Sequence, residues 1–112
     1  MTDWRRSVLD AARFNPDRAA KADLFQGTHL LVGLNCFEPG QSQAVHAHAG
    51  ADKFYLLLSG KARMQVGDQV FEAASGELIW APAGVPHGVE EAIERTVMLV
   101  AIAPAPPSGR AG

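Results

Sequence analysis

Short apolar runs separated by turn-forming residues dominate the chain after Gly27. Glycine, proline, aspartate or serine interrupts the runs, and each of these residue types favours a turn. Runs that recur about every 8 to 12 residues, with no long helical pattern between them, are typical of an all-β sandwich or small barrel. The expected strands cover residues 29–37, 44–48, 54–58, 62–66, 69–73, 78–80, 85–89 and 96–103, with a hairpin turn at 66–69.

The two ends of the chain differ from this pattern. Residues 1–26 are polar and rich in alanine, and a helix over 3–13 or 17–23 would be short and marginal. We therefore expect an N-terminal arm over residues 1–26 and a barrel over residues 27–103. Residues 104–112 are rich in proline and glycine, cannot continue a strand ladder, and are expected to form a loose tail.

Two of the expected strands, 54–58 and 97–103, are apolar on both alternating faces. A sheet with one wet face would alternate apolar and polar residues, so something is expected to cover the outer face of this sheet. The arm of the same chain and a second subunit are the two candidates. A homodimer, with or without exchanged arms, is the favoured expectation because a short arm has limited covering power.

Composition and charge argue against several classes of function. The net charge is −2, from 10 Lys and Arg against 12 Asp and Glu, so there is no basic field to attract nucleic acid. The one cysteine, Cys36, has no intramolecular disulfide partner, which suits a reducing compartment. No run reaches the roughly 18 apolar residues of a membrane span, and the N-terminus lacks the apolar run of a signal peptide. A soluble cytoplasmic protein is the expectation.

Three histidines are the strongest chemical signal in the sequence. His46 and His48 lie two residues apart in an expected strand, so both rings would project from one face, with Cβ atoms roughly 7 Å apart. Such a pair can converge on one metal ion. His87 follows the rigid turn at residues 82–86 and could complete a set of three. Solvent-facing or hydrogen-bonded histidines are the alternative for the isolated pair.

The spacing around these histidines resembles the two signatures of the cupin superfamily. The two stretches are Gly40-x5-His46-x-His48-x4-Lys53-x6-Gly60 and Gly76-x5-Pro82-x-Gly84-x2-His87-x3-Glu91. The family has Glu where Lys53 stands and Asn where Glu91 stands. The resemblance implies a single-domain antiparallel jelly-roll β-barrel with a metal site inside, often dimeric through an exchanged N-terminal strand. His46, His48 and His87 would be the metal ligands, and the position of the fourth, carboxylate ligand falls on Lys53.

Lys53 leaves three alternatives for this site, because a protonated lysine has no lone pair for a metal. Asp52 could supply the missing oxygen through a local bulge. Alternatively, the three histidines bind the metal alone, and Lys53 acts as acid or base or binds a substrate carboxylate or enolate. In the third alternative there is no metal, and Lys53 pairs with Glu38, Asp52 or a bound anion. Imidazole suits several divalent transition metals, including Fe, Mn, Ni and Zn, so the metal is not specified.

The strand that carries Lys53 also contributes to the expected cavity. Lys53, Tyr55 and Leu57 should face the interior, and the Tyr55 hydroxyl either points at a ligand or bonds to the backbone. Two functions fit: a metal-dependent enzyme, dioxygenase- or isomerase-like, in which Lys53 and Tyr55 are the candidate catalytic residues, or a non-catalytic barrel that binds or senses a small molecule. A purely structural protein is the third class, and it predicts no common ion for the histidines.

Overall fold

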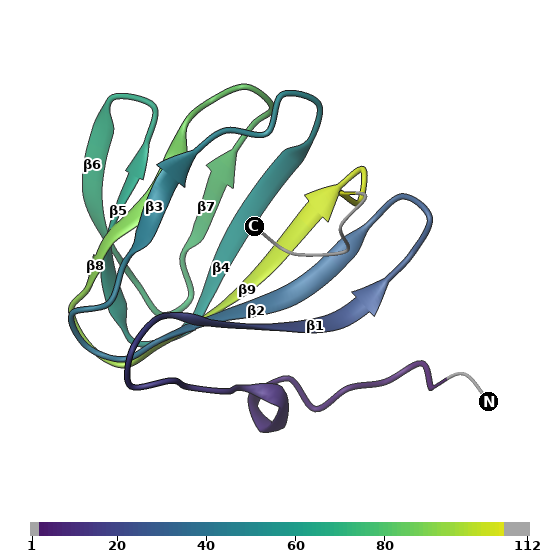
Figure 1. Ribbon diagram of the computed structural model, residues 1–112, viewed down its shortest axis with the longest axis horizontal. Coiled ribbons are helices and arrows are strands. Elements are labelled where there is room, and N and C mark those ends of the chain that lie inside the picture. Colours follow the sequence, from purple (N-terminus) through teal and green to yellow (C-terminus); the bar gives the residue numbers. More distant parts are fainter. Residues whose placement is uncertain (1–2, 107–112) are drawn as a thin grey trace.

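The computed structural model describes residues 3–106 and consists almost entirely of strands joined by short turns (Figure 1). One turn of 3₁₀ helix, η1 (Leu9–Ala11), lies in the N-terminal arm of the described chain. The strands are β1 (Ala20–Gln26), β2 (Leu31–Phe37), β3 (Gln43–His46), β4 (Asp52–Ser59), β5 (Lys61–Val66), β6 (Gln69–Ala74), β7 (Leu78–Ala81), β8 (His87–Ala92) and β9 (Thr96–Ala103). The all-β class expected from the sequence is confirmed.

The strands form two antiparallel sheets that face each other (Figure 1). One sheet has the order β1-β2-β9-β4-β7 and the other has the order β3-β8-β5-β6. From β2 onward the chain crosses between the sheets at every connection except the β5–β6 hairpin. This repeated crossing produces the jelly roll, and the short turns between the apolar runs make it possible.

Alternate side chains of each strand fill the space between the sheets. On β4, Tyr55 and Leu57 are fully buried in the main core, while Phe54, Leu56 and Leu58 on the opposite face are only partly buried. This confirms the facing that the strand period predicts. The main core cluster comprises Leu31, Phe37, Tyr55, Leu57, Ala62, Met64, Ala73, Ile79, Val89, Ala92, Met98, Val100 and Ile102.

The N-terminal arm covers part of the outer face of the five-stranded sheet. Val8 and Phe14 of the arm pack against a second apolar cluster that includes Leu34 and Cys36 of β2 and Val97 of β9. This packing stabilises the arm by removing apolar surface from water on both sides. Coverage by the same chain, the less favoured of the two alternatives, therefore accounts for this part of the face.

The side chain of Arg95 connects the end of the arm to the sheet. The Arg95 guanidinium lies 3.6 Å from the centroid of the Phe14 ring and pairs with a Glu38 carboxylate oxygen at 3.0 Å. Stacking over an aromatic face and pairing with a carboxylate are both favourable for a guanidinium. Arg95 thereby holds the arm against the turn that precedes β9.

The outer face around β4 and β7 has no such cover within residues 3–106. Leu78 and Trp80 of β7 are 64% and 56% exposed, and Leu30, which lines a cavity together with Trp80, is 45% exposed. An apolar cavity of about 220 Å³ opens between Leu30, Phe54, Trp80 and residues of β9. The described chain thus leaves an uncovered apolar patch, formed by Leu30, Phe54, Leu78 and Trp80.

The first strand lies inside the segment expected to be an irregular arm. Residues 20–26 form β1, which pairs with β2 from Ala20↔Cys36 to Gln26↔Leu31 with one bulge after Asp23. The strand was missed because alanine, lysine and aspartate have low β propensity. Pairing with an existing strand and the burial of Leu24 outweigh that local preference. No helix forms over residues 17–23.

The last strand of the barrel is followed by a segment that forms no strand. β9 ends at Ala103, and Pro104 to Pro106 form no strand. Ala105 nevertheless packs against the main core, so this part of the expected tail is attached to the barrel. The remainder of that tail, residues 107–112, lies outside the described residues.

Gly60 occupies a position that other residues fit poorly. Its φ is +89°, and a Cβ atom there would overlap the Arg95 carbonyl oxygen and the Thr96 hydroxyl. Gly40 has nearly the same φ, +88°, but a Cβ there meets nothing within 4 Å. The two glycines therefore separate the effect of backbone conformation from the effect of close packing.

We expect Gly40→Ala to lower the free energy of unfolding by about 1–2 kcal/mol, the strain of a left-handed conformation. Gly60→Ala should cost roughly 2–5 kcal/mol because overpacking is added to that strain. Chemical denaturation of both variants and the wild-type protein measures the difference. Equal losses in the two variants would contradict the close approach at Gly60.

Candidate metal centre

Three histidines from two adjacent strands and a loop meet inside the barrel. His46 ends β3, His87 begins β8, and the two residues are paired across the strands. His48 lies in the loop after β3, not within the strand as expected. The ring centroids are 4.6 Å apart for His46 and His87, 4.9 Å for His46 and His48, and 5.4 Å for His48 and His87.

Close approach of β3 and β8 brings the histidines together. A Cβ atom at Gly88, the residue after His87, would lie 2.8 Å from the Gln43 carbonyl oxygen of β3. The loop is held as well, because the Gly84 backbone N–H donates a hydrogen bond of 2.9 Å to the carbonyl oxygen of His48. His48 is thereby attached to the turn that leads into His87.

Hydrogen bonds define which nitrogen of two rings carries the proton. His46 Nδ1 lies 2.9 Å from the Ala44 carbonyl oxygen, and His87 Nδ1 lies 3.0 Å from the Val85 carbonyl oxygen. A carbonyl oxygen only accepts, so both Nδ1 atoms donate, and in the neutral ring the lone pair is on Nε2. Both Nε2 atoms are buried and have no hydrogen-bond partner among the described residues.

This arrangement fits a divalent transition metal. One nitrogen from each of the three rings lies within 4.8 Å of the others. A donor Nδ1 fixed by a carbonyl oxygen and a buried Nε2 lone pair are the usual state of a ligating histidine. Burial lowers the pKa of His87 to about 4, so its ring is neutral, as a ligand requires, at neutral pH.

Lys53 lies in the same interior. It is 1% exposed, and its Nζ lies 4.4 Å from the centroid of the Tyr55 ring. Burial, and secondarily the charge of Lys21, lowers the pKa of Lys53 to about 7. The charge of Lys53 in turn contributes to lowering the pKa of His87. The burial of Lys53 places it on the interior face of β4, as expected from the alternation of that strand.

Comparison with known proteins identifies the family. The cupin domain matches residues 33–103, which include all three histidines and Lys53. The chain belongs to the cupin family. A protein of Streptomyces coelicolor described as uncharacterized is 30% identical over 104 residues, which cover 93% of this chain and 97% of that protein.

Solved structures agree with this assignment. The protein TT1209 from Thermus thermophilus is 40% identical in sequence and superposes with a TM-score of 0.86. The aligned region covers 91% of this cupin and 98% of TT1209. An RmlC-like cupin protein from Desulfovibrio desulfuricans is 28% identical and has a TM-score of 0.81. The aligned region covers 92% of this chain and 98% of that protein. The cupin resemblance inferred from the two sequence signatures is therefore confirmed.

Neither carboxylate near the signature positions joins the histidine cluster of this cupin. Asp52 is exposed, and its Oδ1 accepts a hydrogen bond of 2.9 Å from the Ala83 backbone N–H. Glu91, at the position of the family's Asn, is paired with Arg63 at 3.3 Å. Glu38, another partner considered for Lys53, is paired with Arg95. The described residues therefore bring no carboxylate into the cluster, and the alternative in which Asp52 supplies an oxygen does not match this geometry.

Tyr55 uses its hydroxyl in a contact that the sequence did not indicate. The hydroxyl donates a hydrogen bond of 2.8 Å to the Gln43 side-chain oxygen, and the ring centroid lies 6.1 Å from that of His87. Burial raises the pKa of Tyr55, so the phenol stays protonated. Gln43 is thus a residue of the site, although no motif marks it.

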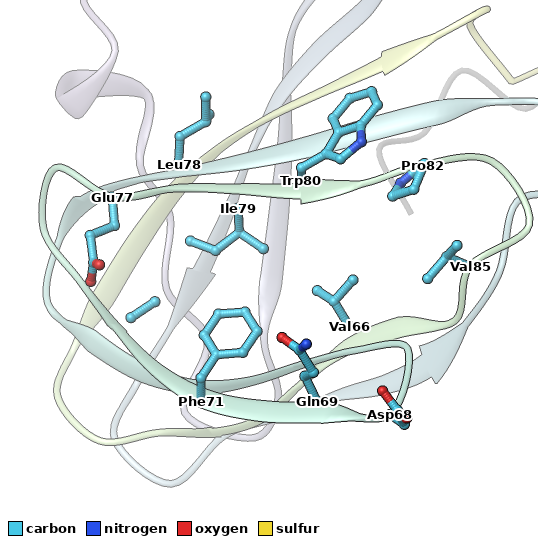
Figure 2. Close-up of a pocket in the computed structure, with 11 residues that line it drawn as sticks. Val66, Asp68, Gln69, Phe71, Glu77, Leu78, Ile79, Trp80, Pro82 and Val85 are labelled. Carbon is cyan, nitrogen blue, oxygen red and sulfur yellow. The ribbon is translucent and has the colours of Figure 1, made fainter.

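Two further cavities open at the surface of the described chain. One of about 360 Å³ is lined by His48, by small residues of the loop 47–51 and by Pro104 to Pro106, so one histidine of the cluster borders it. A larger one of about 420 Å³ lies between the edges of β6 and β7, where Phe71 of β6 and Ile79 of β7 point toward each other and Trp80 lies at the margin (Figure 2). No histidine lines this second cavity.

In residues 3–106, no helix has the length and apolar character needed to cross a membrane.

The lowered pKa of Lys53 predicts a pH dependence of stability. The unfolded chain binds this proton up to a pKa of about 10.4, and the folded chain releases it near pH 7. Between these values the unfolded state holds more protons, so the free energy of unfolding rises with pH, by up to about 1.4 kcal/mol per pH unit. Below pH 7 the full cost of the buried charge is present.

Urea unfolding of chelator-treated protein from pH 6 to 10 measures this dependence against Lys53→Met, which replaces the ammonium with an apolar group of similar length. We expect the difference in stability between variant and wild type to favour the variant at pH 6 and to shrink as the pH rises. A difference that stays constant with pH would contradict the lowered pKa.

Proposed function

We propose that this cupin binds a divalent transition metal through His46, His48 and His87 and is a metal-dependent enzyme, dioxygenase- or isomerase-like, that acts on a small organic molecule in the barrel. The observation that supports this most is the pair of buried Nε2 atoms in rings whose Nδ1 atoms are already committed to carbonyl oxygens. A buried polar atom without a partner is costly, and a metal ion satisfies it. Fe, Mn, Ni and Zn all accept imidazole nitrogen.

The chain's own groups have distinct roles in this proposal. A metal bound there would supply Lewis-acid polarisation of a carbonyl or enolate oxygen. Gln43 holds the Tyr55 hydroxyl, and Tyr55, protonated, forms a wall of the site beside His87. The apolar core excludes water from the inner side, while the cavity next to His48 admits the molecule.

A non-catalytic barrel that binds or senses a small molecule is the second candidate. The burial of Lys53 at the position of the family's carboxylate favours it, because a cation there provides a fixed anchor for a ligand. The two candidates differ in the fate of that ligand. Recovery of the bound molecule unchanged after incubation with metal-loaded protein favours the binding module, and its conversion favours the enzyme.

We expect purified, untagged wild-type protein to contain close to one transition metal ion per chain after reconstitution. His46→Ala and His87→Ala should each reduce the bound metal at least tenfold, because two imidazoles rarely hold a divalent ion against dialysis. His29→Ala is the matched control, since His29 is exposed and lies outside the cluster. Elemental analysis measures all four proteins, and wild-type protein that stays free of metal would overturn the proposal.

We also propose that the cupin is a cytoplasmic homodimer that buries the uncovered patch. The patch of Leu30, Phe54, Leu78 and Trp80 supports this, as do Trp4 and Leu9 of the arm, which are 84% and 61% exposed. Contiguous exposed apolar surface of this kind marks an interface more often than a free surface. A two-fold interface would place the patch of one copy against that of the other.

Trp80→Glu should convert the dimer to a monomer, because it places a charge at the centre of the buried patch. Val70→Glu is the control, since Val70 is 50% exposed on β6 of the other sheet. Size-exclusion chromatography with light scattering gives the mass of each variant. A monomeric wild-type protein at micromolar concentration would contradict the proposed dimer.

A further inference from the structure

The cavity between β6 and β7 lies where both sheets end. β6 is the last strand of the four-stranded sheet and β7 is the last strand of the five-stranded sheet. The cavity measures about 420 Å³, which is within the range of roughly 300–1,000 Å³ typical of small-molecule sites. Its lining, taken from the described part of the chain, includes none of the clustered histidines, so the cavity is separate from the candidate metal centre.

Most of the lining of this cavity is apolar. Phe71 and Ile79 point toward each other across it, and Val66 lies beside them (Figure 2). Phe71 and Val66 also pack against the main core, so the barrel holds this surface in place. The other apolar lining residues are Ala73, Leu78, Trp80, Pro82 and Val85. A molecule with a long apolar part would therefore remove it from water along the middle of the cavity.

The two carboxylates of the lining lie at opposite ends of the cavity (Figure 2). Asp68 belongs to the hairpin turn that precedes β6. Glu77 precedes β7, and its Oε1 accepts a hydrogen bond of 2.7 Å from the Ala74 backbone N–H. Among residues 3–106, the side chains that line the cavity include no lysine or arginine. The cavity thus offers a negative charge at each end and an apolar middle.

The length of β6 determines the spacing of the two charges. Asp68 directly precedes the strand, whereas the Glu77 carboxylate is bonded at its last residue, Ala74. At a rise of roughly 3.3 Å per residue, the two ends lie about 20 Å apart. Allowing about 3 Å at each end for a charge-assisted hydrogen bond leaves roughly 14 Å between two ammonium nitrogens. An extended chain of about ten methylenes spans this length.

We propose that this cavity binds a linear aliphatic diammonium ion, whose two ammonium groups pair with Asp68 and Glu77 while its methylenes lie over Phe71 and Ile79. Gln69, which follows Asp68 and also lines the cavity, has a side-chain oxygen that can accept a hydrogen bond from the same ammonium. A dicarboxylate of the same length would be repelled at both ends. A polyamine with charged nitrogens in its middle would bury them against apolar side chains, which is costly.

Calorimetry with the full chain measures the binding of 1,10-diaminodecane. We expect it to bind at least about tenfold more tightly than 1,4-diaminobutane, which buries fewer methylenes and cannot reach both carboxylates. Decylamine, with a single ammonium, should bind about threefold more weakly than the long diamine. Decanedioate should not bind measurably, and added salt should weaken the binding of 1,10-diaminodecane.

Variants of the two carboxylates test the role of each charge. Asp68→Asn and Glu77→Gln each remove one charge with little change in shape, and the amide oxygen of Glu77→Gln can still accept the bond from the Ala74 N–H. Each should weaken the binding of 1,10-diaminodecane about threefold, and the double variant about tenfold. Glu72→Gln is the matched control, since Glu72 is exposed on β6 and does not line the cavity. Circular dichroism establishes that all the variants are folded.

Several results would overturn this proposal. Equal affinity for the long and the short diamine would contradict the apolar middle, and so would tighter binding of spermine than of 1,10-diaminodecane. Unchanged affinity in the folded double variant would contradict the pairing with Asp68 and Glu77. An equal loss in Glu72→Gln and Glu77→Gln would indicate general attraction to acidic surface and would also overturn it. No measurement involves the metal, so the result is independent of the proposed metal-binding function.

Discussion

The hydrogen bonds from the Nδ1 atoms of His46 and His87 determine the chemistry of this cupin's interior. Each ring donates to the carbonyl oxygen two residues before it in the chain, at Ala44 and at Val85. The same bond fixes the tautomer, orients the ring and directs the Nε2 lone pair into the space between the sheets. The backbone therefore preorganises the site. Burial of the two Nε2 atoms without hydrogen-bond partners has an energetic cost, which a ligand bound to them would offset.

The two-sheet architecture determines what can approach the histidine cluster. Because His46 and His87 belong to one sheet and Lys53 to the other, their separation depends on how the sheets pack. The main core with Tyr55 and Met64 maintains that packing. Tyr55 connects the two sides, since it contacts Lys53 and bonds to Gln43 of β3. A change in the core near Tyr55 would alter the distance between the cation and the histidines without changing either.

Regular alternation and short-range motifs made much of this structure predictable. The period of β4 placed Lys53, Tyr55 and Leu57 inside, and the fixed spacings around His46, His48 and His87 indicated the family and the cluster. β1 was missed because its stability comes from pairing with β2, which its own residues do not encode. The bond between Tyr55 and Gln43 joins residues twelve positions apart on different sheets, so no local pattern reveals it.

The strand that carries Lys53 has a consequence for how such sites diverge. β4 lies between β9 and β7, and Lys53 is paired with Ile102 on one side and Ala81 on the other, so the backbone at this position is fixed by its neighbours. The side chain can then change while the scaffold stays the same. A lysine codon and a glutamate codon differ by a single base, and that one substitution changes the charge of the interior by two units. One point mutation can thus exchange an acidic side chain for a basic one inside the same barrel.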